Sequence, residues 1–193
     1  MAWQPGNDIE IKTERFRLRT LKPADANETY VSWWNDAELQ RGFNMPARNW
    51  TLGRARQHIA RFDQAQKCHL GIYTKGDSAL IGFFTILREP ENEIATTNIC
   101  IGKRDLQGGQ AALEVKRAMI DFMFREMGVR KVEGRVIGRN LASFAVYHGL
   151  KFNPEGVLRK HVRGLEGGRA DVYLFGMLRD EWFKENAIGR GQT

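Results

Sequence analysis

The sequence contains few cysteines and no long apolar run. Its two cysteines, Cys68 and Cys100, lie far apart, each inside an apolar stretch typical of a strand. We therefore interpret both as reduced core residues of a cytoplasmic protein, and we expect no disulfide. No apolar run approaches the roughly 20 residues that a membrane-spanning helix requires. The N-terminus lacks a basic segment followed by an apolar run, so we predict neither a signal peptide nor a membrane partner.

Metal-ligand spacing, repeats and low-complexity segments are also lacking. The 4 histidines are scattered along the chain, so we expect no metal site. A length of 193 residues, 42% of them apolar and 27% charged, is typical of one globular domain that spans the whole chain. We expect only the two ends, residues 1–8 and 187–193, to be flexible.

Positive charge is in excess, with a net charge of +7. Such a balance suits an acidic partner or a cofactor with several phosphates, although charge alone favours a generally basic surface without a dedicated partner. The sequence lacks the interleaved aromatic and basic strand pattern of a nucleic-acid-binding module. Nucleic acid is therefore not the partner that we expect.

Apolar periodicity and turn signals predict an α+β fold, with a mixed, mostly antiparallel sheet flanked by helices. Seven strands are expected, at residues 9–21, 69–74, 80–87, 94–101, 130–137, 151–160 and 170–178. Helices should follow the turn at 22–25, cover 51–66 with Thr51 as N-cap, and run from about 110 to 127, whereas 41–50 is expected to be irregular. One stripe of the helix after residue 110 is ordinary core packing: Ala112, Val115, Met119, Met123 and Met127.

A strand, a glycine-bearing loop and a helix over residues 94–127 are the most informative segment. The loop is Gln107-Gly108-Gly109-Gln110-Ala111-Ala112. Unpaired N–H groups and the helix dipole at such a junction favour a phosphate, although a plain N-capping loop is the alternative. The layout therefore predicts a cofactor that carries phosphate groups.

Several short motifs share the order and spacing of a known family. They are Arg17-Leu18-Arg19, Trp34-Asn35-Asp36, Ile99-Cys100-Ile101-Gly102, Asn140-Leu141-Ala142-Ser143, Glu155-Gly156-Val157-Leu158-Arg159, and the stretch from Asp171 to Trp182. With these motifs the chain resembles the GCN5-related N-acetyltransferase (GNAT) superfamily, from about residue 15 to residue 182. Within it, the chain is most similar to the group that contains the ribosomal-protein N-terminal-amine acetyltransferases.

Two departures from the family pattern are visible. The family loop is Arg or Gln, two residues, Gly, one residue, then Gly or Ala, whereas Gln110 stands at the central glycine here. A β-carbon there would narrow the approach of a pyrophosphate, although the Gln110 amide can itself donate to a phosphate. The usual Gly-Phe after the short helix is Lys151-Phe152. A CoA-binding domain with little catalysis therefore remains an alternative function.

The resemblance implies direct acetyl transfer from acetyl-CoA to an amine. It places the pantetheine arm along the backbone of Ile99, Cys100 and Ile101, with a main-chain N–H near Cys100 or Ile101 on the thioester carbonyl. The pyrophosphate would lie on the N–H groups of the loop, residues Gln107, Gly108, Gly109, Gln110, Ala111 and Ala112. Asn140 could bond the pantetheine amide, cap its own helix, or do both.

The resemblance also implies the catalytic residues. Tyr147 is the expected general acid, because a phenol held close to the sulfur can protonate the departing thiolate; a packing tyrosine is the alternative. Ser143, one helical turn earlier, is a weaker catalytic candidate. No general base is evident, since this sequence has Thr96 where several family members carry a glutamate. A water chain or bulk solvent would then accept the amine proton.

We expect the acceptor amine to lie opposite the cofactor. Its candidate ligands are Trp34, Asn35, Phe43 and His161, although the aromatic residues among them could equally belong to the core. Basic residues between 159 and 169 would make that rim positive, which disfavours a polyamine. We expect a protein or peptide N-terminal amine as acceptor, with an amino sugar or another small amine as alternatives. An exposed edge strand in the last pair would allow a homodimer.

Overall fold

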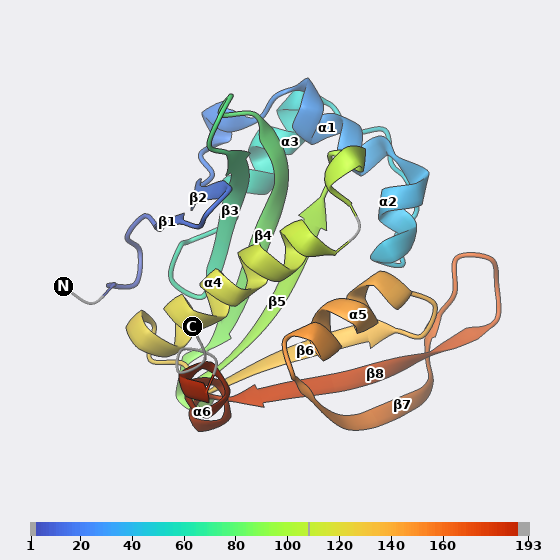
Figure 1. Cartoon of the computed structure of the whole chain (residues 1–193). Helices are drawn as coiled ribbons and strands as arrows, with labels where there is room; N and C mark the ends of the chain where they lie inside the picture. Colours follow the sequence, from blue (N-terminus) through green and yellow to red (C-terminus); the bar gives the residue numbers. More distant parts are fainter. Residues whose placement is uncertain (1–2, 108, 189–193) are drawn as a thin grey trace.

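The computed structural model describes residues 3–107 and 109–188. They form an eight-stranded sheet in the order β1-β2-β3-β4-β5-β6-β8-β7 (Figure 1). The strands are β1 Glu10–Lys12, β2 Phe16–Thr20, β3 Lys67–Thr74, β4 Leu80–Glu89, β5 Ile94–Ile101, β6 Lys131–Ile137, β7 Asn153–Arg163 and β8 Arg169–Leu178. Neighbouring strands are antiparallel, except that β5 and β6 are parallel. The ends for which we predict flexibility fall partly outside the described residues.

The sheet has one strand more than predicted, because residues 9–21 form two strands instead of one. β1 ends at Lys12, the chain turns, and β2 pairs back antiparallel with Glu10 opposite Arg19. Thr13 closes this turn: its hydroxyl accepts a hydrogen bond from the N–H of Phe16 at 3.0 Å. The predicted fold class, a mixed and mostly antiparallel sheet with flanking helices, is confirmed.

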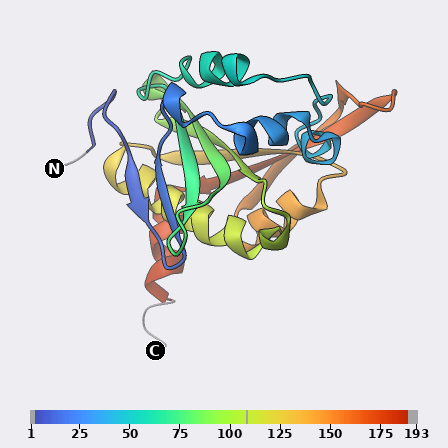
Figure 2. The same ribbon diagram turned by 90° about the horizontal axis from the view of Figure 1, so that it is seen from above.

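Helices cover both faces of the sheet (Figure 2). On one face lie α1 Glu28–Asn35, α2 Ala37–Gly42 and α3 Leu52–Ile59; on the other lie α4 Gln110–Glu126 and α5 Leu141–Gly149, with α6 Arg179–Ile188 at the end of β8. Thr51 caps α3, as predicted. The predicted helix over 51–66 is shorter than expected and ends at Ile59. Residues 41–50 were expected to be irregular, but residues 41 and 42 belong to α2. The Asp36 side chain starts this helix by accepting hydrogen bonds from two backbone N–H groups.

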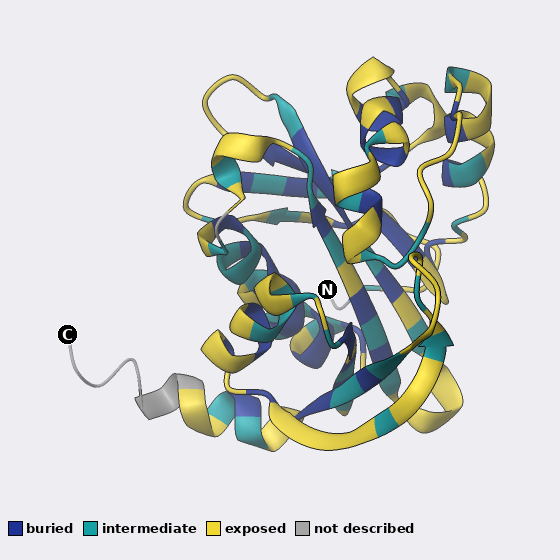
Figure 3. Ribbon diagram, turned by 90° about the vertical axis from the view of Figure 1, so that its right-hand side faces the viewer, coloured by how far each residue is buried: buried dark blue, intermediate teal, exposed yellow. Residues whose placement is uncertain are grey.

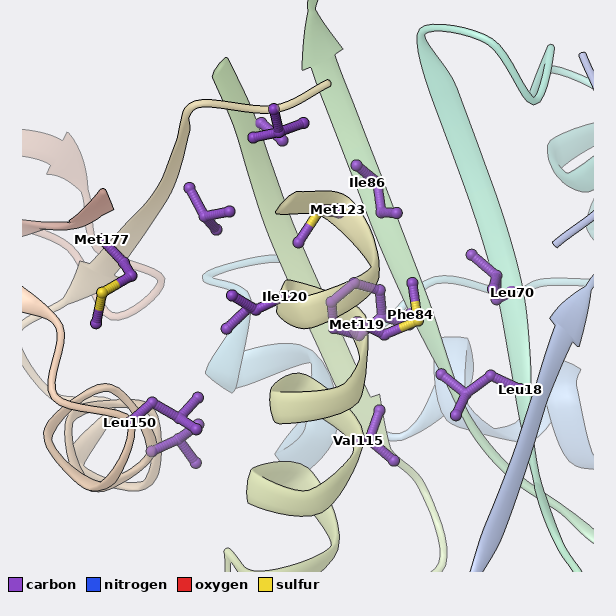
Figure 4. Close-up of a cluster of buried hydrophobic side chains, with 14 of the residues drawn as sticks. Leu18, Leu70, Phe84, Ile86, Val115, Met119, Ile120, Met123, Leu150 and Met177 are labelled. Carbon is purple, nitrogen blue, oxygen red and sulfur yellow. The ribbon is translucent and has the colours of Figure 1, made fainter. Parts of the chain in front are cut away.

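Two apolar clusters hold the layers together. In the larger one, strand residues meet the apolar stripe of α4 (Figure 4). Its completely buried members include Leu18, Leu70, Phe84, Ile86, Val115, Met119 and Met123. Burial of each such side chain contributes about 1.5–3 kcal/mol. The smaller cluster is rich in aromatic residues and lies on the opposite face, under α1 and α3. The packing role predicted for the α4 stripe is therefore confirmed.

β7 is an edge strand whose residues are mostly exposed (Figure 3). Cys68 and Cys100 are both free and buried, as predicted. Over the described residues, the helices are too short or too polar to cross a membrane.

Candidate active site

The central strands β5 and β6 separate after a short parallel contact. Their register runs only from the pair Ile94–Lys131 to the pair Thr96–Glu133. Beyond these pairs β5 continues along β4 and β6 continues along β8, so the sheet opens between them (Figure 1). The facing backbone edges of β5 and β6 are therefore available to a ligand in the opening.

Backbone alternation decides which residues of β5 face this opening. The N–H of Gly102 donates to a β4 carbonyl at 2.8 Å, whereas the carbonyl of Ile101 accepts from the Gln107 side chain at 3.0 Å on the other side. Because the backbone groups of a strand alternate between its two neighbours, Ile99 shares the direction of Ile101. The main chain of Cys100 points toward β4. Ile99 and Ile101 thus turn their N–H and C=O groups toward β6.

A cavity of about 590 Å³ occupies the opening. Its walls come from β5, β6, β7, β8, α4, α5 and the end of α2. Of the residues predicted from the sequence, the cavity is lined by Phe43, Ile99, Cys100, Ile101, Gln107, Gly109, Ala112, Asn140, Ser143, Tyr147 and His161. Among the described residues, Trp34, Asn35, Gln110 and Ala111 do not line it. Gly108 lies outside the described residues.

The N-terminus of α4 reaches the cavity through Gly109. This residue has a φ of 95°, a backbone conformation that favours glycine. Its carbonyl accepts the helical hydrogen bond from Leu113 N at 2.8 Å, so the first N–H groups of α4 have no acceptor inside the helix. Gln110 begins the helix with an ordinary negative φ. The departure from the family pattern at Gln110 therefore does not strain the loop, because the left-handed position falls one residue earlier.

Tyr147 lies in α5 with 4% of its surface exposed. Its ring stacks on Phe175 at a centroid distance of 5.1 Å and meets Phe152 edge-on at 5.0 Å. Below it, Gly134 of β6 leaves the space that the ring occupies, since a β-carbon there would overlap the phenol. Burial raises the pKa of Tyr147 to about 12, and the neighbouring Thr97 hydroxyl partly opposes this rise. The phenol is thus held rigidly in the cavity wall in its neutral form.

Asn140 fixes the start of α5. Its Oδ1 accepts a hydrogen bond from the N–H of Ser143 at 3.1 Å, which confirms the predicted N-cap. Its Nδ2 donates to the carbonyl of Gly42 at 2.9 Å and so joins α5 to the end of α2. Both ends of the amide are engaged within the protein. The chief role of this side chain is therefore to position the cavity wall that carries Ser143 and Tyr147.

Two of the predicted acceptor ligands pack away from the cavity. The Trp34 ring stacks on Trp50 at 4.2 Å and on Phe83 at 5.5 Å, within the aromatic cluster. The Asn35 side chain exchanges two hydrogen bonds with the backbone of Trp50, at 2.7 and 3.2 Å. Both residues hold the segment before α3 against α1. Phe43 and His161 are the predicted acceptor ligands that do line the cavity.

Lys116 is a cavity residue that sequence patterns did not single out. Its side chain leaves α4 toward Tyr147, and its Nζ lies 3.7 Å from the centre of that ring. A signal was present, because Lys116 follows Ala112 by four residues and precedes Met119 by three. A lysine at this spacing belongs to the buried face of the helix, where an ionisable group is rare.

The chain matches the family described as "Acetyltransferase (GNAT) domain" over residues 15–153. It is 27% identical over 178 residues to the "Uncharacterized N-acetyltransferase p20" of Bacillus licheniformis, a match that covers 89% of this chain and 97% of that protein. The protein therefore belongs to the GNAT acetyltransferase family and is an N-acetyltransferase. Among the residues that the structure describes, no three His, Cys, Asp or Glu side chains gather to hold a metal ion.

Solved structures share the fold. A ribosomal L7/L12 α-N-protein acetyltransferase in complex with coenzyme A superimposes with a TM-score of 0.79 and 15% identity, over 90% of this chain and 99% of that one. The spermidine N-acetyltransferase of Vibrio cholerae, in complex with CoA and spermine, gives a TM-score of 0.77 and 16% identity, over 87% of this chain and 98% of that one. These two neighbours act on different classes of amine, so the fold does not select the acceptor.

Proposed function

We propose that this enzyme uses acetyl-CoA as its acetyl donor and the α-amine of a protein or peptide as its acceptor. The observation that carries the proposal is the opening between β5 and β6: it forms a cavity that extends from the N-terminus of α4 to Tyr147. A helix N-terminus suits the pyrophosphate, and a free strand edge suits the amide-containing pantetheine arm. The family neighbours in complex with CoA agree with this donor.

The residues of the cavity support a direct transfer. Backbone N–H groups of Ile99 and Ile101 face the opening and can stabilise charge on the thioester oxygen. The hydroxyl of Tyr147 can donate a hydrogen bond to the sulfur as it leaves. Gln107 and Gly109 lie at the phosphate end of the same cavity. The lining of this cavity thus offers a candidate group for the pyrophosphate, for the thioester oxygen and for the departing sulfur.

The charge of the cavity favours an α-amine over a polyamine. Lys116, Arg104, Arg135 and His161 line it, against Glu38 as the one carboxylate among the described lining residues. The Glu38 side chain is 79% exposed and its carboxylate lies 3.3 Å from Arg104, so Glu38 does not serve as a buried general base for the acceptor amine. An α-amine has a pKa of about 8, compared with about 10.4 for a lysine amine, so near pH 7 about a tenth of it is already neutral and able to react without a protein base, against less than a thousandth of a lysine amine. A polycation would also be repelled by Arg104 and Arg135, whose positive charge in the lining exceeds the negative charge of Glu38.

Calorimetric titration is expected to show micromolar binding of acetyl-CoA to the purified protein. Desulfo-CoA should bind similarly, because the phosphate and pantetheine contacts do not involve the sulfur, and ATP should not bind measurably. Absence of binding by both CoA compounds up to millimolar concentration would contradict the donor assignment and leave a family fold without its chemistry.

A thiol-release assay with matched acceptors tests the second half of the proposal. A peptide with a free N-terminus should support turnover, and the same peptide with an acetylated N-terminus and one free lysine should be slower by at least about tenfold, following the amine pKa values. Spermidine and a nucleotide-linked amino sugar are the comparison acceptors. Faster turnover of either one would reassign the substrate. Release of thiol by none of them, with acetyl-CoA bound, would favour a CoA-binding domain with little catalysis.

A further inference from the structure

Lys116 is a buried lysine without an acidic partner. Its side chain is 2% exposed, yet it borders the cavity. The Nζ lies 3.7 Å from the centre of the Tyr147 ring and 6.0 Å from that of Phe152. Over the residues that the structure describes, it makes no ion pair and no hydrogen bond. Buried charged groups are ordinarily paired, because an unpaired one destabilises the fold.

A second buried polar group lies in the same wall. Thr97 of β5 is 3% exposed and lines the cavity, and its hydroxyl lies beside that of Tyr147, whose pKa it lowers. Both Lys116 and Thr97 neighbour the Tyr147 side chain. Buried polar groups normally find partners, so Lys116, which has only ring contacts beside this phenol, would gain its missing interaction from a ligand of the cavity.

We propose that Lys116 is the cation that stabilises the CoA thiolate as it leaves, acting beside the hydroxyl of Tyr147. The inference rests on the proposed function, because it requires acetyl-CoA in this cavity. The acceptor nitrogen bonds to the carbonyl carbon, the C–S bond breaks, and its electron pair stays on sulfur. The proton released by the nitrogen ends on the sulfur, and Lys116 returns to its initial state.

The acid strengths in the cavity explain why Tyr147 alone is not sufficient. A thiol has a pKa of about 8.5, so a phenol whose pKa is raised to about 12 by burial protonates a thiolate only against a large free-energy difference. Burial lowers the pKa of Lys116 to about 7, which makes its ammonium form a stronger acid than the thiol. A thiolate nearby would in turn favour the charged lysine, so the two groups would ionise together.

The other ionisable groups of the cavity do not take this role. Those that line it are Glu38, Cys100, Arg104, Arg135, Tyr147 and His161. Glu38 and Arg104 pair with each other, Arg135 and His161 are exposed, and burial raises the pKa of the Cys100 thiol to about 12. Only burial contributes to the lowered pKa of Lys116, so no neighbouring charge controls it. Burial in the cavity and the charge of a bound ligand therefore control the ionisation of Lys116.

The thiol pKa of bound CoA tests the proposal without an acceptor. It is measured from the ultraviolet absorbance of the thiolate during a pH titration, as the difference between the CoA and desulfo-CoA complexes. In the native protein the bound thiol should have a lower pKa than in free CoA. In Lys116→Met this pKa should rise by about one unit, a tenfold loss of thiolate over thiol, while desulfo-CoA still binds. Lys103→Met removes an exposed lysine by the same chemical change and should leave the pKa unchanged.

The outcomes separate this inference from the proposed function. Equal thiol pKa values in the native protein and Lys116→Met would overturn the role of Lys116, even with CoA bound. Failure of the native protein to bind CoA would instead overturn the proposed function. Lys116→Arg, which keeps the charge, should retain part of the shift. The protein's own thiols do not interfere, because burial raises the pKa values of Cys68 and Cys100 to about 12.

Thermal unfolding supplies a second, independent measurement. The folded lysine has a pKa of about 7 against an ordinary 10.5, so between these values the unfolded chain binds a proton that the folded chain does not. The lysine therefore destabilises the fold most at and below pH 7 and not at all above pH 10.5. Lys116→Met should melt higher than the native protein at pH 7, with the gain shrinking as the pH rises. A lower melting temperature at pH 7 would make Lys116 a packing residue and contradict the proposal.

Discussion

Replacement of Tyr147 by phenylalanine is expected to lower kcat by about 10- to 1,000-fold, with little change in the affinity for acetyl-CoA. The substitution removes one oxygen and keeps the ring that stacks on Phe175 and Phe152. What is lost is the donor that stabilises charge on sulfur in the transition state. A loss confined to kcat is the sign of an interaction made only at that stage. Turnover with the acceptor that the thiol-release assay selects and calorimetry with acetyl-CoA measure the two quantities.

Tyr73→Phe is the matched control for this change. Tyr73 is also a buried tyrosine, with 7% of its surface exposed, but it belongs to the aromatic cluster on the opposite face of the sheet. Loss of its hydroxyl should leave kcat unchanged. Turnover by Tyr147→Phe at the native rate would show that Tyr147 only packs, the alternative that the sequence left open.

Local signals in the sequence predict the elements that build the site. The apolar spacing of α4, the strand that precedes it and the capping residues Thr51 and Asn140 depend on neighbouring residues along the chain. Their structures therefore agree with the prediction. The prediction of one strand over residues 9–21 was wrong, because the turn at Thr13 divides this segment into two strands.

The roles of side chains in the cavity depend on contacts distant in sequence, so they are harder to predict. Trp34 and Asn35 stand in a family motif, yet both contact Trp50 instead of the cavity. Gly109 is the loop residue with the left-handed backbone conformation. The family pattern can be aligned with this loop in more than one register, so it does not determine which residue adopts that conformation. The proposed role of Lys116 depends on its contact with Tyr147, which lies 31 positions further along the chain and on another helix.

Gly134→Ala is expected to lower both stability and activity. The added methyl group would occupy the space of the Tyr147 phenol, and the ring has Phe175 and Phe152 on its other sides. Overpacking of this kind destabilises a fold by about 1–3 kcal/mol. Movement of the phenol away from β6 would also displace its hydroxyl from the sulfur, so kcat should fall by at least about tenfold.

Gly156→Ala in the exposed strand β7 separates this effect from the general cost of adding a methyl group to a strand glycine. Its β-carbon would meet no atom within 4 Å, so stability and turnover should stay close to native. Denaturant unfolding and steady-state kinetics on the two variants test the geometry directly. Native kinetics in Gly134→Ala would mean that the phenol can move without loss, and hence that its position against β6 is not what catalysis requires. If the variant loses kcat while acetyl-CoA still binds, the close contact between β6 and α5 is part of the catalytic apparatus, because it determines where the phenol meets the thioester.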